Sequence, residues 1–146
     1  MRLQLTNQVS EQIRAHGARG YPHEVCGALL GSEVVGQGGG AFRKVTAVLP
    51  LENEREEAAR HNRFSVTPQD VLRAEGAARD AGLDLLGWYH THPDHPARPS
   101  EFDREHAWPW YSYVILSVTS RLPGDMTSWR LADDRSAYSA ESIEVG

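Results

Sequence analysis

The stretch Gly87-Trp88-Tyr89-His90-Thr91-His92-Pro93-Asp94-His95-Pro96-Ala97-Arg98-Pro99-Ser100-Glu101-Phe102-Asp103-Arg104-Glu105-His106 holds four of the chain's seven histidines. Its beginning reads as the end of a strand over residues 83–91, which Pro93 stops. Alternate residues of a strand face the same side, so His90 and His92 point together. A proline-rich loop then leads to Ser100, where a helix is predicted to begin. Two imidazoles and one carboxylate with an open fourth position make a catalytic zinc arrangement.

Each part of this pattern also has a simpler interpretation. A His-x-His pair alone is more often incidental than a metal site. Ser100 and Asp103 have the spacing of a helix capping box, with the carboxylate placed favourably for the helix dipole. A capped helix start is compatible with a ligand, because it fixes the direction of the carboxylate. The residues alone do not choose Asp103 over its rivals Asp94, His95 and His106.

The rest of the chain predicts alternating strands and helices, hence a mixed α/β or α+β fold. Leu5, Val9 and Ile13 recur every four residues, which predicts a helix starting at Thr6 or Asn7 and ending between residues 17 and 20. The other expected elements are a hairpin of strands 25–31 and 42–49 around a glycine turn at 36–40, a polar loop or short helix at 51–62, a brief strand at 63–67, a helix at 68–81, a strand at 111–118, and closing strands at 126–131 and 139–145.

Composition limits the class of protein. The 146 residues suit one domain, taken as 1–146. A net charge of −5 argues against a nucleic-acid partner. The sequence has no run of 18 apolar residues, so it predicts no membrane-spanning helix. The N-terminus lacks the apolar core of a secretion signal, and the single cysteine, Cys26, suits a reducing compartment. We therefore expect a soluble, cytoplasmic protein. Cys26 lies in an apolar run, so a buried core thiol is favoured over a nucleophile.

The sequence lacks the motifs of several alternative chemistries. The zincin pattern H-E-x-x-H is absent, and one cysteine cannot supply the Cys-x-x-Cys ligands of zinc fingers or nucleobase deaminases. The chain also has no nucleophile elbow, phosphate-binding P-loop or dinucleotide-binding glycine fingerprint.

The combined motif resembles that of the JAMM (MPN+) metalloproteases. Their signature is an upstream glutamate, then His-x-His, ten residues, and an aspartate. Here ten residues separate His92 from Asp103, and both Pro93 and the Ser100-x-x-Asp103 pairing match. The segment Tyr21–Gly31 resembles the family segment that bears the catalytic glutamate, and Arg63-Phe64 resembles another recurrent element. The form of the loop is most similar to the small stand-alone bacterial members.

This resemblance implies a set of roles. His90, His92 and Asp103 would ligate one zinc ion per chain, with a bound water. Glu24 would act as general base and then pass the proton to the leaving amine, and Ser100 would donate a hydrogen bond to the oxyanion. The implied architecture is the MPN/JAB1 fold: a curved, mixed, mostly antiparallel sheet flanked by helices and similar to that of cytidine deaminases.

The resemblance also implies a function: zinc-dependent hydrolysis of a peptide or isopeptide bond after the C-terminal diglycine of a ubiquitin-like or sulfur-carrier protein. Two alternatives stay open: a non-catalytic MPN-type scaffold, or a zinc hydrolase of small amides and peptides. An extended substrate tail could add to an exposed sheet edge. The oligomeric state is undetermined, with a homodimer among the options. Asp94 and His95 are expected to be exposed, and Trp108, Trp110 and Tyr111 to serve in packing.

Overall fold

Strands and helices alternate along the chain, as the sequence predicts. The computed structural model describes residues 1–36, 38–51 and 66–146. Within these residues the elements, in chain order, are β1 (Arg2–Leu5), α1 (Asn7–Gly20), β2 (Cys26–Val35), β3 (Ala41–Leu51), α3 (Pro68–Asp80), β4 (Asp84–Pro93), α4 (Glu101–His106), β5 (Ser112–Thr119), β6 (Leu122–Leu131) and β7 (Tyr138–Val145). The predicted loop or short helix at 51–62 and strand at 63–67 fall mostly on residues 52–65, which, with the Arg63-Phe64 pair, lie outside the described residues. Leu51 belongs to β3, and residues 66 and 67 are not in a strand.

The strands form one sheet that curves until it closes. Their order is β1-β3-β2-β4-β5-β6-β7, and β1 pairs in parallel with both β3 and β7. Antiparallel pairings join β2 to β3 and β4, and β6 to β5 and β7. The central pair, β4 and β5, is parallel. The predicted curved, mixed sheet is confirmed. Closure leaves none of the described strands unpaired along its whole length.

Strand β1 was missed by the sequence reasoning, which placed Leu5 on the first helix. Leu3 and Leu5 are both fully buried, and their alternation faces them into the core from a strand. A four-residue strand shows too little of this pattern to be recognised, and the spacing from Leu5 to Val9 imitates a helix. Helix α1 begins after Thr6, whose hydroxyl accepts a hydrogen bond from the Val9 N–H at 3.1 Å. The prediction of that cap is confirmed.

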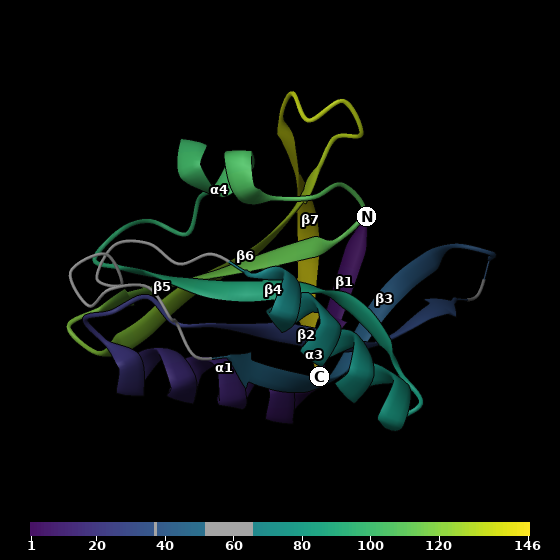
Figure 1. Ribbon diagram of the computed structural model, residues 1–146, viewed down its shortest axis with the longest axis horizontal. Coiled ribbons are helices and arrows are strands. Elements are labelled where there is room, and N and C mark those ends of the chain that lie inside the picture. The colour runs from purple at the N-terminus through teal and green to yellow at the C-terminus, as the bar shows by residue number, and fades with distance from the viewer. Residues whose placement is uncertain (37, 52–65) are drawn as a thin grey trace.

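Two hydrophobic clusters cover opposite faces of the central strands, since sequence neighbours such as Ala28 and Leu29 belong to different clusters. Val9 and Ile13 of α1 join the first cluster, and α3 packs over the second (Figure 1). Cys26 lies in the second cluster and is 3% exposed. Burial, reinforced by nearby Asp70 and Glu24, raises the pKa of its thiol to about 12. The expectation of a buried, unreactive thiol is therefore confirmed.

None of the described helices combines the length and apolar character needed to cross a membrane. Helix α4 lies beside the carboxyl end of β4, on the side to which the turn between β6 and β7 also extends (Figure 1). This arrangement brings together the residues that the sequence singled out.

Candidate metal centre

The carboxyl end of β4 carries the two histidines. The strand is buried from Leu85 onward, and β2 and β5 flank it on either side. His90 and His92 lie on the same face, as their spacing predicts, and their Nε2 atoms are 3.2 Å apart. Both are buried, with 3% and 9% of their surface exposed. Two imidazole nitrogens thus meet at one point near the surface.

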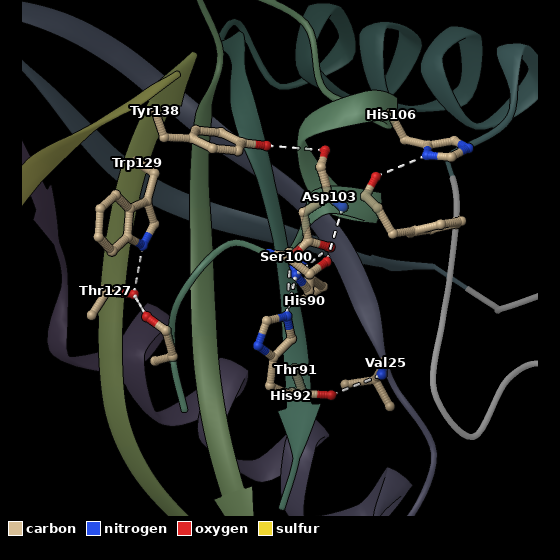
Figure 2. A network of polar contacts seen from close by, with 12 residues as sticks. Val25, His90, Thr91, His92, Ser100, Asp103, His106, Thr127, Trp129 and Tyr138 are labelled. Carbon is tan, nitrogen blue, oxygen red and sulfur yellow. Dashed lines mark hydrogen bonds and ion pairs between the residues drawn. The ribbon is translucent and has the colours of Figure 1, made fainter. Parts of the chain in front are cut away.

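Helix α4 brings a carboxylate to the same point. Ser100 and Asp103 form the predicted capping box: the Ser100 Oγ accepts the Asp103 N–H at 3.0 Å, and the Ser100 N–H donates to Asp103 Oδ2 at 2.8 Å. The box turns the carboxylate toward the histidines. Asp103 Oδ2 lies 3.1 Å from His92 Nε2, and Oδ1 lies 3.4 Å from His90 Nε2 (Figure 2).

A hydrogen bond made by Nδ1 of His92 leaves the other ring nitrogen, Nε2, to face the Asp103 carboxylate. Its Nδ1 lies 2.8 Å from the carbonyl oxygen of Pro96, which can only accept, so Nδ1 carries the proton. In its neutral form the ring therefore points a lone pair from Nε2 at Asp103, whose carboxylate is also an acceptor. Two acceptors 3.1 Å apart need a cation or a shared proton between them. Such an outer hydrogen bond to a carbonyl is common for metal-ligating histidines.

The electrostatics of His92 and Asp103 also favour positive charge at this point. Burial acts to lower the pKa of His92, but the hydrogen bonds to Asp103 and the Pro96 carbonyl outweigh it and raise that pKa. Burial acts to raise the pKa of Asp103, yet the two histidines and the Ser100 amide hold it well below its usual range. The carboxylate is therefore ionised and attracts positive charge to this point.

The distances also fit zinc. Ligand atoms about 2.0–2.1 Å from a tetrahedral ion lie roughly 3.3–3.4 Å from one another. Here the two Nε2 atoms are 3.2 Å apart, and the nearest oxygen of Asp103 is Oδ2 for His92, at 3.1 Å, and Oδ1 for His90, at 3.4 Å. Among the described residues, His90, His92 and Asp103 make up the group of His, Cys, Asp or Glu whose ligand atoms converge in this way. The donor set of two imidazoles and one carboxylate suits zinc and leaves a fourth position for water or substrate.

Glu24 lies beside this centre. It is 5% exposed and lines a cleft of about 670 Å³ together with His92, Ser100 and Asp103. The sequence reasoning placed Glu24 at the site through family resemblance alone.

Residues 6–132 match the family described as prokaryotic homologs of the JAB domain. The chain belongs to this family. It is 34% identical over 126 residues to a desampylase from Haloferax volcanii, covering 83% of this chain and 84% of that protein. It is also 34% identical over 108 residues to a probable TtuB-protein conjugate cleaving protease from Thermus thermophilus, covering 74% of this chain and 65% of that protein.

Solved structures agree with the fold of this JAB domain. The solution structure of a protein from Desulfitobacterium hafniense has a TM-score of 0.81 at 32% identity, covering 99% of this chain and 92% of that one. A protein from Salinibacter ruber has a TM-score of 0.73 at 44% identity, covering 100% of this chain and 92% of that one. A JAB1/MPN domain protein from Archaeoglobus fulgidus, 13% identical, shares the fold with a TM-score of 0.60 and 98% coverage of both chains.

The rivals of Asp103 in the JAB domain make other contacts. Asp94 accepts a hydrogen bond from the Tyr21 hydroxyl at 2.7 Å, and His106 Nδ1 lies 2.8 Å from the Phe102 carbonyl oxygen. His95 is exposed, and its backbone carbonyl accepts the Ser117 hydroxyl at 2.7 Å. Asp94 is also exposed, as expected, but its bond to Tyr21 ties the loop after His92 to the segment that leads to Glu24.

Thr91 is a residue whose part the sequence reasoning missed. It points away from the two histidines, and its hydroxyl accepts the Val25 N–H at 2.9 Å, while its own N–H donates to the Val25 carbonyl at 3.0 Å (Figure 2). These two bonds fix the backbone next to Glu24 against the strand that carries His90 and His92. In the sequence, Thr91 shows only as a hydroxyl residue between two histidines. Its contact with Val25 can be inferred only once β2 is known to lie beside β4.

The aromatic residues that follow α4 divide between core and surface. Tyr111 packs edge-on against buried Trp88, with ring centroids 5.9 Å apart. Trp108 and Trp110 stay 63% and 50% exposed. The expected packing role, in the core and at its rim, therefore holds for all three. Tyr111 packs in the core, whereas Trp110 packs edge-on against Tyr111 at 5.5 Å and Trp108 lies 5.6 Å from the Arg135 guanidinium.

Proposed function

We propose that this JAB domain, residues 1–146 as one unit, is a zinc-dependent peptidase. Its reaction is the hydrolysis of a peptide or isopeptide bond after the C-terminal diglycine of a ubiquitin-like or sulfur-carrier protein. The observation that carries the proposal is the convergence of His90, His92 and Asp103 at one point, with His92 and Asp103 lining a cleft that buried Glu24 also lines. The two relatives support the substrate class, since one is named a desampylase and the other a conjugate cleaving protease.

In this proposal His90, His92 and Asp103 hold one zinc ion per chain. Zinc in such a site polarises a carbonyl and lowers the pKa of a water to about 7. Glu24 takes the proton from the water that attacks the carbonyl and then gives it to the departing amine. General acid–base catalysis of this kind is typically worth about 10²–10⁴-fold in rate.

Ser100 supplies a donor to the carbonyl oxygen. Its Oγ accepts the Asp103 N–H, and a hydroxyl that accepts one hydrogen bond keeps its own proton for donation. Ser100 lines the cleft beside His92 and Asp103, so the hydroxyl is within the region where the carbonyl would be polarised. A donor aimed at developing negative charge contributes roughly 3–4 kcal/mol to the transition state.

The residues that line the cleft support the proposed diglycine specificity. Pro93, Pro96 and Phe102 line it with rigid or bulky side chains close to the ligands. Two residues without side chains would pass such walls where branched residues would not. The lone cysteine suits a compartment where thiols stay reduced, which supports a cytoplasmic location for the reaction.

The test is hydrolysis of a ubiquitin-like protein joined through its C-terminal Gly-Gly to a reporter, compared with the same fusion carrying Val-Val. We expect cleavage of the first fusion alone, its loss with a chelator, and its return with Zn²⁺. Equal cleavage of both fusions would overturn the diglycine specificity and favour a hydrolase of small amides or peptides. Bound zinc without cleavage of either fusion would favour a scaffold.

A further inference from the structure

Helix α4 carries Asp103 but has little of its own to hold it in place. It spans six residues, and none of them is buried. Helices this short are marginal in isolation and normally depend on packing of an apolar face. The capping box fixes the first turn internally, but it does not attach the helix to the sheet. The Asp103 carboxylate contacts His90 and His92 of β4, and contacts from another part of the molecule also set the position of the helix.

The turn between β6 and β7 makes that attachment through Arg135. Its Nη1 donates to the carbonyl of Ala107 at 2.7 Å, and its Nη2 donates to the carbonyl of Glu105 at 3.2 Å. The backbone carbonyl of Arg135 in turn accepts Arg104 Nη1 at 3.1 Å. The carbonyls at the end of α4 thereby gain a cationic partner, which also suits the helix dipole.

Tyr138, the first residue of β7, contacts the same helix at the ligand itself. Its hydroxyl donates to the backbone carbonyl of Asp103 at 3.1 Å (Figure 2). The contact is to the backbone, so the Asp103 carboxylate remains directed at the two histidines. Arg135 and Tyr138 therefore hold α4 at its end and at its middle, through contacts that span 28 and 35 residues of sequence.

Arg135 keeps an unfavourable backbone conformation at this position. Its φ is 65°, a left-handed value that side chains other than glycine rarely adopt. The surrounding turn is closed by bonds from the N–H of Ala132 to the carbonyl of Ala137 and from the N–H of Arg135 to the carbonyl of Ala132. Strained residues persist where the surrounding structure or the function requires them. At this position the residue in the strained conformation is the arginine whose side chain reaches α4.

We propose that Arg135 and Tyr138 act together as a brace that positions α4, and with it Asp103, at the metal centre. They are positioning residues, because neither takes part in the ligand set. The inference rests on the proposed function only in taking Asp103 to be a zinc ligand; the attachment of α4 to the turn is independent of that assignment.

Arg121 provides a matched control within the same fold. It also lies in a turn between two strands with a positive φ, 67°, and its Nη1 donates to a helix carbonyl, that of Ala18 in α1, at 3.3 Å. Arg121→Gly removes an arginine of the same kind from a helix that carries no ligand. Glycine accepts the left-handed backbone at both positions, so neither turn is strained by the change.

The experiment measures zinc affinity by competition with a chelating indicator, amide hydrogen exchange in α4 of the metal-free protein, and thermal unfolding. For Arg135→Gly we expect zinc binding about 10-fold weaker and exchange in α4 about 10-fold faster, with unfolding temperature unchanged or higher. Tyr138→Phe should show a smaller change, about three-fold, in the same two readouts. Arg121→Gly should leave zinc binding and α4 exchange at wild-type values.

Wild-type zinc binding together with unchanged α4 exchange in Arg135→Gly and Tyr138→Phe would overturn the brace. An equal loss of zinc affinity in Arg121→Gly would also overturn it, because the effect would then be general. If Arg135→Gly does not fold, Tyr138→Phe decides by the same readouts. If the wild-type protein binds no zinc, the proposed function fails, while exchange in α4 still decides whether the turn holds the helix.

Discussion

Helices α3 and α4 begin in the same way. In α3, Thr67 Oγ1 accepts the Asp70 N–H at 3.1 Å and the Thr67 N–H donates to Asp70 Oδ2 at 2.9 Å. In α4, Ser100 and Asp103 make the same pair of bonds at 3.0 and 2.8 Å. Both are capping boxes with an aspartate in the third helical position. Local chemistry does not distinguish the two starts.

The surroundings of α3 and α4 do distinguish the two helices. Helix α3 spans 13 residues and buries Ala74 and Ala78 against the sheet, whereas α4 spans six and buries none. Asp103 faces two histidines from the end of β4, while Asp70 belongs to no convergent ligand group among the described residues. A capping box therefore marks where a helix begins, and the strand that lies opposite decides whether its carboxylate also becomes a ligand.

The strongest way to break this comparison is to replace each aspartate by asparagine. Asp103→Asn keeps an acceptor for the Ser100 N–H but removes the charged ligand, so zinc affinity should fall at least about 100-fold and hydrolysis should become undetectable. Asp70→Asn should cost only about 0.3–1 kcal/mol of unfolding free energy, with activity retained. Zinc titration and urea unfolding of both variants check this. Equal behaviour of the two would mean that Asp103 is merely a helix cap.

Glu24→Gln separates metal binding from proton transfer. The amide has the size of the carboxyl group but cannot take a proton from water at neutral pH. We expect zinc affinity near wild type and turnover reduced about 10²–10⁴-fold. Single-turnover cleavage of the diglycine fusion and zinc analysis of the same sample provide the measurement. Full turnover in this variant would remove Glu24 from the mechanism.

The two cap residues sharpen the comparison further. Ser100→Ala and Thr67→Ala each remove one cap, which typically costs about 1 kcal/mol of unfolding free energy. Ser100→Ala should in addition lower kcat by about 10²–10³-fold, because it removes a donor to the carbonyl oxygen. Thr67→Ala should leave kcat unchanged. If both variants lose the same stability and neither loses activity, Ser100 acts only as a cap.

The smallest effect is expected at Thr91. Thr91→Val preserves shape but leaves the buried Val25 N–H without its acceptor, which typically costs about 1–3 kcal/mol in stability. Because Val25 adjoins Glu24, we expect kcat to fall about 10-fold while zinc affinity stays within about two-fold. Thr91→Ser restores the hydroxyl and should recover most of the rate. A loss of zinc as large as that of rate would contradict this role.

Much of the site could be predicted from sequence because its parts are local. The i, i+2 spacing of the histidines on a strand and the capping box at Ser100 are short-range patterns, and both predicted elements are confirmed. The cap of α3 at Thr67 was predicted for the same reason and is also confirmed. Such features depend on neighbours within a few residues, where backbone geometry alone sets which side chains meet.

The parts that sequence did not reveal depend on long-range pairing. Strand β1 exists because its four residues pair with β3 and β7, more than 35 residues away along the chain. The bond from Val25 to Thr91 and the contacts of Arg135 with α4 likewise need the register of the closed sheet. Glu24 could be placed at the site only by family resemblance, since nothing in its own neighbourhood indicates that it is buried.

Crystals grown with Zn²⁺ and measured on both sides of the zinc absorption edge test the central claim most directly. We predict one anomalous peak per chain, bounded by His90 Nε2, His92 Nε2 and a carboxylate oxygen of Asp103. The peak should be retained in Glu24→Gln and lost in Asp103→Asn. A peak at other residues, or none in a wild-type protein that cleaves the diglycine fusion, would contradict the account.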